Sequence, residues 1–321
     1  LGRCQTGARM SFDLTRLTET VRTHGAVVRL LVSRSAGSAP RDAGTSMLIW
    51  ADGAEGTIGG GTLEYQAIAE AREMLATKAT LRHRAVALGP ALGQCCGGSV
   101  TLVWERFDEG TLPASLPFAR SLGPSEAMPE TVARKAKALQ PGALPAEIDG
   151  WLIEAAPALR RPLWIWGAGH VGRALADVLR PLPDFEITWV DTGPHRFPPE
   201  IPSGITTLPA AEPSVLAAHA PREAEHLVLT FSHELDLALC HALLSRGFKG
   251  LGLIGSATKW ARFKSRLAGL GHTREEIARI ACPIGDPKLG KHPHAIALGV
   301  ATSLLSRADN REIADGDRHT A

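Results

Sequence analysis

The stretch PLWIWGAGHVGRALADVLRPL, residues 162–182, decides the fold of the second half of this chain. An apolar run typical of a strand leads into a glycine turn, GAGHVG at 167–172, and then into a segment with helical spacing of its apolar residues. The glycines follow G-x-G-x-x-G, and Asp191 ends the next apolar run, FEITWVD, nineteen residues after Gly172. A strand, a glycine turn, a helix and an acidic residue in this order predict a Rossmann-like βαβ unit.

Each residue of this fingerprint has an expected role. Gly167 permits the tight turn, Gly169 lets a phosphate approach the backbone, and Gly172 lets helix and strand pack closely. The helix N-terminus supplies free N–H groups for the phosphate, and Asp191 can accept hydrogen bonds from a ribose. A dinucleotide is therefore a candidate ligand. The alternative is that the glycines serve only strand–helix packing.

Two histidines in this half are open to two interpretations. His170 lies inside the fingerprint and is either a ligand contact or a solvent-facing helix residue. His233, in TFSHELD, follows a strand end, where α/β sites gather, and equally fits as a neighbour of a helix cap. No residues downstream of the fingerprint form an obvious hydride-transfer site, which disfavours nicotinamide redox chemistry.

The residues after the fingerprint alternate between strand and helix patterns. HLVLTFS (226–232) and GLGLIGS (250–256) are apolar strands, and a helix fits 234–246 between them. This alternation predicts a parallel sheet covered on both faces. We expect the fold class α/β, with a C-terminal Rossmann-like doubly wound parallel sheet over residues 161–310 and a smaller N-terminal α+β domain over 11–107.

The N-terminal half mixes helix and strand signals. Helical spacing predicts helices over 13–25 and 63–75. Residues 108–160 are rich in Pro and small residues and are interpreted as a linker with one helical piece near 130–139. Residues 1–10 and 311–321 are expected to be tails. Apolar and β-branched runs predict strands at 26–34, 46–50, 83–88 and 99–107.

Composition narrows the classes of function. The 321 residues carry a formal charge of +2, so we expect no nucleic-acid partner, and 44% hydrophobic residues are typical of globular proteins. No apolar run approaches the ~18 residues of a membrane span, and the first ten residues lack the apolar segment of a secretory signal. Five cysteines form no disulfide framework for this length, and we expect the reducing cytoplasm.

The stretch GQCCGG, residues 93–98, places two of the five cysteines side by side between glycines. Zinc binding is disfavoured, because adjacent cysteines rarely both reach one tetrahedral ion. A vicinal disulfide would be strained, whereas a reactive thiolate or a soft-metal ligand suits the open backbone N–H groups. Gln94 can both donate to and accept from a planar heterocycle. The alternative is that Cys95 and Cys96 only pack a hairpin corner.

Two further glycine-rich stretches belong to the same half. SAPRDAG (38–44) places Arg41 in a loop at a strand end, and GTIGGGTLE (56–64) opens a helix with three glycines, an arrangement that suits an anion. Arg41 is either a phosphate ligand beside this loop or a solvated loop charge. Three glycine-rich loops at strand ends indicate a single ligand that needs close approach to the backbone.

Seven stretches, in order along both predicted domains, form a recognisable set. They are GSAPRDAGTSML (37–48), DGAEGTIGGGTLE (52–64), GQCCGG (93–98), LWIWGAGHVGRALA (163–176), WVDTGPHRF (189–197), LIGSATKWARF (253–263) and CPIGDPKLGKHP (282–293). The set resembles the XdhC/CoxI family, the accessory proteins that mature molybdenum hydroxylases, and above all the members that serve xanthine dehydrogenase.

The resemblance implies a chaperone rather than an enzyme. Its ligand would be molybdenum cofactor, a pterin dithiolene with a phosphate (molybdopterin). The protein would hold it while a cysteine desulfurase supplies the terminal sulfido ligand, then deliver it to xanthine dehydrogenase, and it would be a homodimer. The cofactor residues so implied are Gln94, Cys95, Cys96, Gly97 and Gly98, with both cysteines as metal ligands, and, for the pterin or phosphate, Arg41, Gly59, Gly60 and Gly61.

The chain departs from the family pattern in the second domain. Phe231 stands where a second histidine is common, and His294 and Ala295 stand where acidic residues are usual. These departures disfavour a bound ion or a proton shuttle there. Two other functions stay open: a NAD-dependent oxidoreductase that uses the cysteine pair in thiol redox chemistry, and a scaffold that joins desulfurase and dehydrogenase without holding cofactor.

Overall fold

The computed structural model describes residues 12–89, 97–124 and 127–316. The chain divides between Leu159 and Arg160 into two compact units. The N-terminal unit ends at Leu159, and the C-terminal unit starts at Arg160. Helices and strands are both present in each unit, which confirms the expected α/β class with an α+β N-terminal part.

The C-terminal unit contains a six-stranded parallel sheet, which confirms the fold expected from the fingerprint. Its strand order is β11-β10-β9-β12-β13-β14. The chain therefore moves outward from β9 in one direction and from β12 in the other, as in doubly wound folds. The strands are β9 (Arg161–Trp166), β10 (Phe185–Asp191), β11 (Ile205–Pro209), β12 (Glu225–Val228), β13 (Gly250–Leu253) and β14 (Ile280–Ala281).

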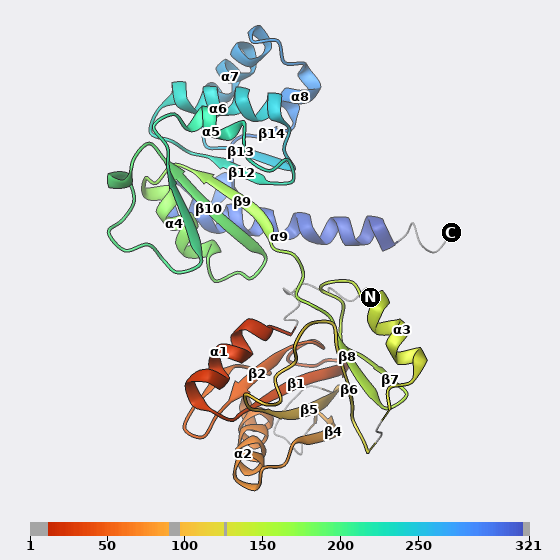
Figure 1. Ribbon diagram of the computed structural model, residues 1–321. Coiled ribbons are helices and arrows are strands. Elements are labelled where there is room, and N and C mark those ends of the chain that lie inside the picture. The colour runs from red at the N-terminus through yellow and green to blue at the C-terminus, as the bar shows by residue number, and fades with distance from the viewer. Residues whose placement is uncertain (1–11, 90–96, 125–126, 317–321) are drawn as a thin grey trace. The chain divides into compact units, whose positions relative to one another are not determined.

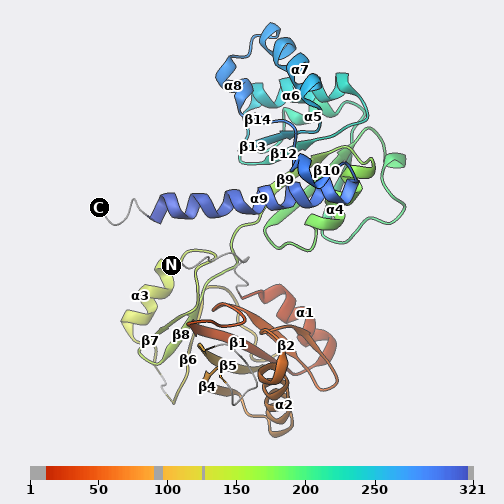
Figure 2. The same cartoon turned by 180° about the vertical axis from the view of Figure 1, so that it is seen from behind.

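Helices cover both faces of this sheet (Figures 1 and 2). Because side chains alternate along a strand, Leu163 and Ile165 of β9 are buried toward α4 and α9, and Trp164 and Trp166 toward the helices on the opposite face. The helices are α4 (His170–Leu179), α5 (Pro213–Ala217), α6 (His233–Arg246), α7 (Ala257–Gly269), α8 (Arg274–Ala278) and α9 (Pro293–Gly316), with short 3₁₀ turns η2 (Pro194–Arg196) and η3 (Pro287–Leu289).

The end of the chain is more helical than expected. Residues 311–316, expected to be part of a tail, continue the backbone of α9, since no proline interrupts the segment after Pro293. No helix within the described ranges has both the length and the apolar character needed to cross a membrane.

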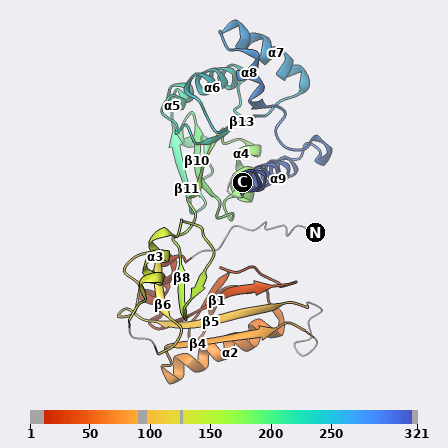
Figure 3. The same cartoon turned by 90° about the vertical axis from the view of Figure 1, so that its right-hand side faces the viewer.

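The N-terminal unit is built on a five-stranded antiparallel sheet of order β3-β2-β1-β5-β4. One face of this sheet packs against α2, whose buried side chains recur every three or four residues (Figure 3). The other face receives α1. These elements are α1 (Leu14–His24), β1 (Val27–Ala36), β2 (Ser46–Ile49), β3 (Ala54–Gly56), α2 (Gly61–Thr77), β4 (Leu81–Ala87) and β5 (Ser99–Phe107).

Residues 108–160, expected from composition to be a linker, are folded into the N-terminal unit as far as Leu159. They form a second antiparallel sheet of order β6-β8-β7, and α3 lies where a helical piece near 130–139 was expected. The elements are β6 (Phe118–Ser121), α3 (Glu130–Ala138), β7 (Ala146–Ile148) and β8 (Trp151–Glu154).

Apolar packing on both sides of β8 explains why this segment folds. Trp151 and Ile153 are buried against Val132 of α3. Leu152, on the opposite side of β8, is buried against Leu31 of β1. Because β8 buries residues on both of its faces, it orders the chain before and after it despite the prolines of this segment.

Four buried charged residues join the two sheets of the N-terminal unit. Arg29 of β1 donates two hydrogen bonds to Glu154 of β8, at 2.8 and 2.7 Å. Arg120 of β6 bonds to Glu154 and also to Glu105 of β5, so each sheet supplies one cation and one carboxylate. Burial by itself raises the pKa of Glu154, but Arg29 and Arg120 outweigh it and lower the pKa to about 2.

Replacing Glu154→Gln should lower the free energy of unfolding by about 3–5 kcal/mol at neutral pH, because both arginines lose their shared counter-charge. The pKa of Glu154 is lower in the folded state than its ordinary value of 4.5. Its contribution is therefore complete above that value and is lost as the pH falls toward 2. Urea unfolding across this range should show a steeper loss of stability for the wild type than for the variant.

The exposed Glu109 provides the matched control, and Glu109→Gln should leave both the stability and its pH dependence unchanged. If Glu154→Gln and the wild type lost stability in parallel on acidification, the buried charge cluster would not be the cause.

Candidate functional site

The GSAPRDAG and GQCCGG stretches meet directly at Gly37 and Gly98. A side-chain carbon added to Gly37, whose φ is +70°, would lie 3.0 Å from the Cα of Gly98. A side-chain carbon on Gly98 would lie 2.5 Å from the carbonyl oxygen of Ser38 and would also collide with that of Ala36. Only glycine allows the two loops to approach this closely.

The third glycine-rich loop contacts the first through Gly59. Its φ is +119°, and a side-chain carbon there would lie 2.5 Å from Cβ of Pro40 and 3.6 Å from Cγ of Arg41. The Arg41 side chain is exposed, and no described residue forms a hydrogen bond or ion pair with it. The three glycine-rich loops thus lie together, with an unpaired cation beside them.

The anion-binding arrangement expected at Gly59–Gly61 already holds a carboxylate of the chain itself. Glu64 Oε2 accepts hydrogen bonds from the N–H groups of Ile58 at 2.9 Å and Gly60 at 3.0 Å, and the N–H of Gly59 donates to the Thr57 hydroxyl. Burial raises the pKa of Glu64, but the hydrogen bonds from Thr57 and the backbone outweigh it and lower the pKa. In this structure these N–H groups stabilise Glu64, and Arg41 is the group left for an outside anion.

Gln94, Cys95 and Cys96 lie outside the described residues, so their role stays a prediction. The base of their hairpin is described, and the N–H of Leu88 donates to the carbonyl of Gly98 at 2.8 Å. Gly97 is exposed, with nothing within 4 Å of an added side-chain carbon. The described part of this stretch is therefore accessible to a ligand.

The dinucleotide fingerprint of the C-terminal unit has the geometry expected of two of its three glycines. Gly167 has φ +122°, and a side-chain carbon there would lie 2.5 Å from the carbonyl oxygen of Leu229. One on Gly172 would collide with the carbonyl oxygen of Gly167, so helix α4 packs directly on the strand. Gly169, at the N-cap of α4, is open, with no side-chain cap bond.

Asp191, expected to bind a ribose, is engaged within the protein. It is 4% exposed, and its Oδ2 accepts from the N–H of Ala168 at 2.6 Å. Its Oδ1 accepts from the N–H of Thr192 at 2.6 Å and from Arg196 Nε at 3.3 Å. Asp191 thus fixes the fingerprint loop in this structure, which matches the strand–helix packing alternative more closely than an open ribose site.

The histidines of this unit that the sequence analysis singled out lie on its surface. His170 is the first residue of α4 and is exposed. His233 is the first residue of α6, next to Ser232, whose side chain caps that helix. This position agrees with the cap-neighbour interpretation of His233. Phe231 is 66% exposed, and the guanidinium of Arg196 lies 4.8 Å from its ring centre. His294 is exposed on α9.

Sequence reasoning missed a buried ion pair at the carboxyl ends of β12 and β13. Asp236 is fully buried, and its Oδ2 accepts from Lys259 Nζ at 2.6 Å. Lys259 also donates to the carbonyl of Ile254 at 2.9 Å, and Asp236 accepts from the hydroxyl of Thr230 at 2.7 Å. The pair thereby ties together the loops that follow both strands. The sequence did contain a signal for this pair. Asp236 in TFSHELD and Lys259 in LIGSATKW each follow shortly after a predicted strand.

The two cysteines that the structure describes, Cys240 and Cys282, have no sign of reactivity. Burial raises the pKa of both Cys240 and Cys282, so both thiols stay protonated at neutral pH. Among the residues that the structure describes, no group of three His, Cys, Asp or Glu side chains could hold a metal ion.

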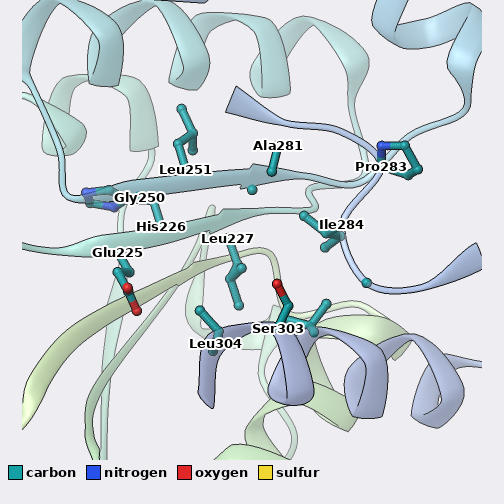
Figure 4. Close-up of a pocket in the computed structure, with 13 residues that line it drawn as sticks. Glu225, His226, Leu227, Gly250, Leu251, Ala281, Pro283, Ile284, Ser303 and Leu304 are labelled. Carbon is teal, nitrogen blue, oxygen red and sulfur yellow. The ribbon is translucent and has the colours of Figure 1, made fainter. Parts of the chain in front are cut away.

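A cavity of about 130 Å³ lies between the sheet and α9 (Figure 4). Gly250 and Gly252 of β13 line it without side chains, and Ser303 and Leu304 line it from α9. Glu225 is 6% exposed, and its Oε2 has no hydrogen-bond partner among the described residues. The cavity includes no residue of the fingerprint, so it is separate from the candidate dinucleotide site.

Replacing Gly98→Ala should force apart the loops that meet at Ala36 and Ser38, and we expect a loss of about 1–3 kcal/mol in the free energy of unfolding. Gly89→Ala in the same connection is the matched control, since an added carbon there has nothing within 4 Å. Chemical denaturation of both variants measures the difference. Equal stability of the two would show that the close approach at Gly98 is not required.

Gly169 and Gly172 of the C-terminal fingerprint should also differ in their tolerance of a side chain. Gly172→Ala should cost about 1–3 kcal/mol, because the methyl group collides with the Gly167 carbonyl and α4 must shift. Gly169→Ala should change stability by less than ~0.5 kcal/mol, since its φ of −73° suits any residue and the space is open. Urea unfolding of both variants tests this order, and the reverse order would contradict it.

Two family models match the chain, one in each unit. The model described as XdhC and CoxI family matches residues 20–84, and the XdhC Rossmann domain matches residues 163–304. The first range contains Arg41 and the glycines at 59–61, and the second contains the fingerprint.

Two individual proteins extend the comparison. The uncharacterized protein YqeB of Escherichia coli is 27% identical over 281 residues, which are 86% of this chain, and the chain spans only 42% of its length. A crystal structure described as a xanthine dehydrogenase (BH1974) from Bacillus halodurans has a TM-score of 0.69 and 18% identity, with 92% of this chain and 96% of that chain covered. This likeness supports the fold of both units.

The family matches fall in the expected order, one in each unit, and they contain two of the three glycine-rich loops and the fingerprint, while GQCCGG lies outside both. The chain belongs to the XdhC/CoxI family.

Proposed function

We propose that this protein binds molybdenum cofactor on its N-terminal unit, holds it while a cysteine desulfurase supplies the terminal sulfur, and delivers it to xanthine dehydrogenase. Family membership suggests a role in maturation as an accessory protein. The Bacillus halodurans protein of similar fold is described as a xanthine dehydrogenase, the enzyme proposed here as the client. As the family resemblance implies, the proposal includes a homodimer as the working form.

The observation that carries this proposal is the contact between three glycine-rich loops, one of which contains Arg41. A planar, phosphate-bearing ligand needs close backbone approach and a cation, and the described residues provide both at one place. The described residues fit such a ligand in two respects, its phosphate and its close approach to the backbone. An unpaired exposed Arg41 and the open Gly97 suit it, whereas the N–H groups near Gly59 and Gly60 are occupied by Glu64 and Thr57.

The residues of this chain divide the task of holding the ligand. In the proposal, Cys95 and Cys96 provide soft thiolate ligands for molybdenum, and Gln94 exchanges hydrogen bonds with the pterin. Gly97 and Gly98 provide backbone N–H groups, and Arg41 neutralises the phosphate. Delivery then requires only that the client bind the cofactor a few kcal/mol more tightly than this protein does.

Cys95→Ala and Cys96→Ala should each abolish cofactor retention, because the loss of a thiolate removes a ligand of molybdenum and leaves the cofactor open to exchange. The protein is mixed with released molybdenum cofactor without oxygen and passed through a gel-filtration column, and molybdenum in the protein fraction is measured. Cys282→Ala, in the other unit, is the matched control and should retain the cofactor like the wild type.

The same samples separate the alternatives. Full retention by both loop variants would overturn the proposed role of the cysteines. Saturable NADH turnover by the wild type would favour the oxidoreductase. A complex with desulfurase and dehydrogenase that forms equally with and without cofactor, together with no retention, would favour the scaffold.

A further inference from the structure

The N-terminal unit contains an open cleft of about 730 Å³ that none of the predicted site residues lines. Arg34 of β1 and His83 of β4 line it from the large sheet, and Glu147 and Asp149 from β7 and the turn after it. Its volume lies in the range of pockets that bind small organic ligands, about 300–1,000 Å³.

The charged groups of this cleft are only partly paired with one another. No described residue forms a hydrogen bond or ion pair with the exposed Arg34 side chain. Glu147 Oε1 accepts from the Ser33 hydroxyl at 2.6 Å and lies 3.8 Å from His83 Nε2, and no described residue donates to its Oε2. Asp149 accepts from the Thr131 hydroxyl at 2.9 Å. The cleft thus offers a free guanidinium and a fixed carboxylate with one oxygen available.

This set of charges selects the chemistry of the ligand. A simple polyanion would meet two carboxylates, Glu147 and Asp149, against one arginine. A ligand that has N–H donors at one end and an anionic group at the other satisfies both kinds of group. The amino-pyrimidinone edge of a pterin presents adjacent N–H donors, which a carboxylate accepts well, and the phosphate of the cofactor suits Arg34.

The strand register places this cleft close to the cysteine stretch. Arg34 is paired with Thr101, and Ala36 is paired with Ser99, which follows Gly98 directly. Two residues along a strand correspond to about 7 Å. His83 is on the neighbouring strand of the same hairpin, which the GQCCGG stretch connects. Gly98, the described end of that stretch, therefore lies at the same end of the sheet as Arg34.

We propose that this cleft holds the pterin of the cofactor, with Glu147 accepting the N–H donors of the pterin and Arg34 serving as a further cation for the phosphate in addition to Arg41. The inference rests on the proposed function and specifies where its ligand lies. His83 lies beside Glu147 and supports it.

The test uses two probes on the full chain. Pterin-6-carboxylate, a fluorescent pterin with an anionic group, is titrated against the protein, and retention of whole molybdenum cofactor is measured by gel filtration. Arg34→Ala and Glu147→Gln should each weaken pterin binding about tenfold or more, whereas Arg34→Lys should recover part of the affinity. Arg72→Ala removes the same charge from the exposed side of α2 and should bind like the wild type.

The outcomes separate this inference from the function on which it rests. Undiminished pterin binding and cofactor retention in Arg34→Ala and Glu147→Gln, with loss in Cys95→Ala, would overturn the cleft and leave the function standing. Failure of the wild type to retain cofactor, with pterin binding that still depends on Arg34, would overturn the function and keep a pterin site. Wild-type protein that binds neither probe would overturn both. Thermal unfolding of each variant shows whether the fold is intact.

Discussion

The close approach of backbone to backbone at Gly98 is the constraint on which the candidate site depends. The carbonyl groups of Ala36 and Ser38 occupy the space that any side chain at Gly98 would need. A side chain at Gly37 or Gly59 would also come too close to a neighbouring loop. Three loops from separate parts of the chain therefore share one small region. The described residues of these loops are held by contacts with one another before a ligand arrives, which lowers the entropy cost of binding.

Both glycine-rich loops that were expected to bind anions contain a carboxylate of the protein. Glu64 occupies the N–H groups near Gly60, and Asp191 occupies the N–H of Ala168 in the fingerprint. The physical reasoning about exposed N–H groups was sound, since each loop does hold an anion. The anion is supplied internally in each case. Arg41 and Arg34, which have no partner among the described residues, are the groups that remain for an external phosphate.

The local signals in the sequence predicted the local structure well. The fingerprint at Gly167–Gly172 predicted the doubly wound sheet, because its turn, helix and strands are contiguous in the chain. The segment 108–160 was misjudged, because Leu152 and Glu154 help to order it and their partners include Leu31 and Arg29, more than a hundred residues away. The internal use of Asp191 was equally invisible, since it depends on which N–H group the fold brings within reach. The cysteine pair itself lies outside the described residues, and its role rests on chemistry and family.

The four-residue charge cluster has a consequence for how this protein can be divided. A fragment cut after Phe107 would keep Arg29 and Glu105 in the interior and discard both of their partners on β6 and β8. Segments 1–107 and 108–159 are therefore not interchangeable modules, although the family match in this half ends at residue 84. A chimera with a relative would have to exchange Arg29, Glu105, Arg120 and Glu154 as a set, because these four side chains neutralise one another as one electrostatic unit.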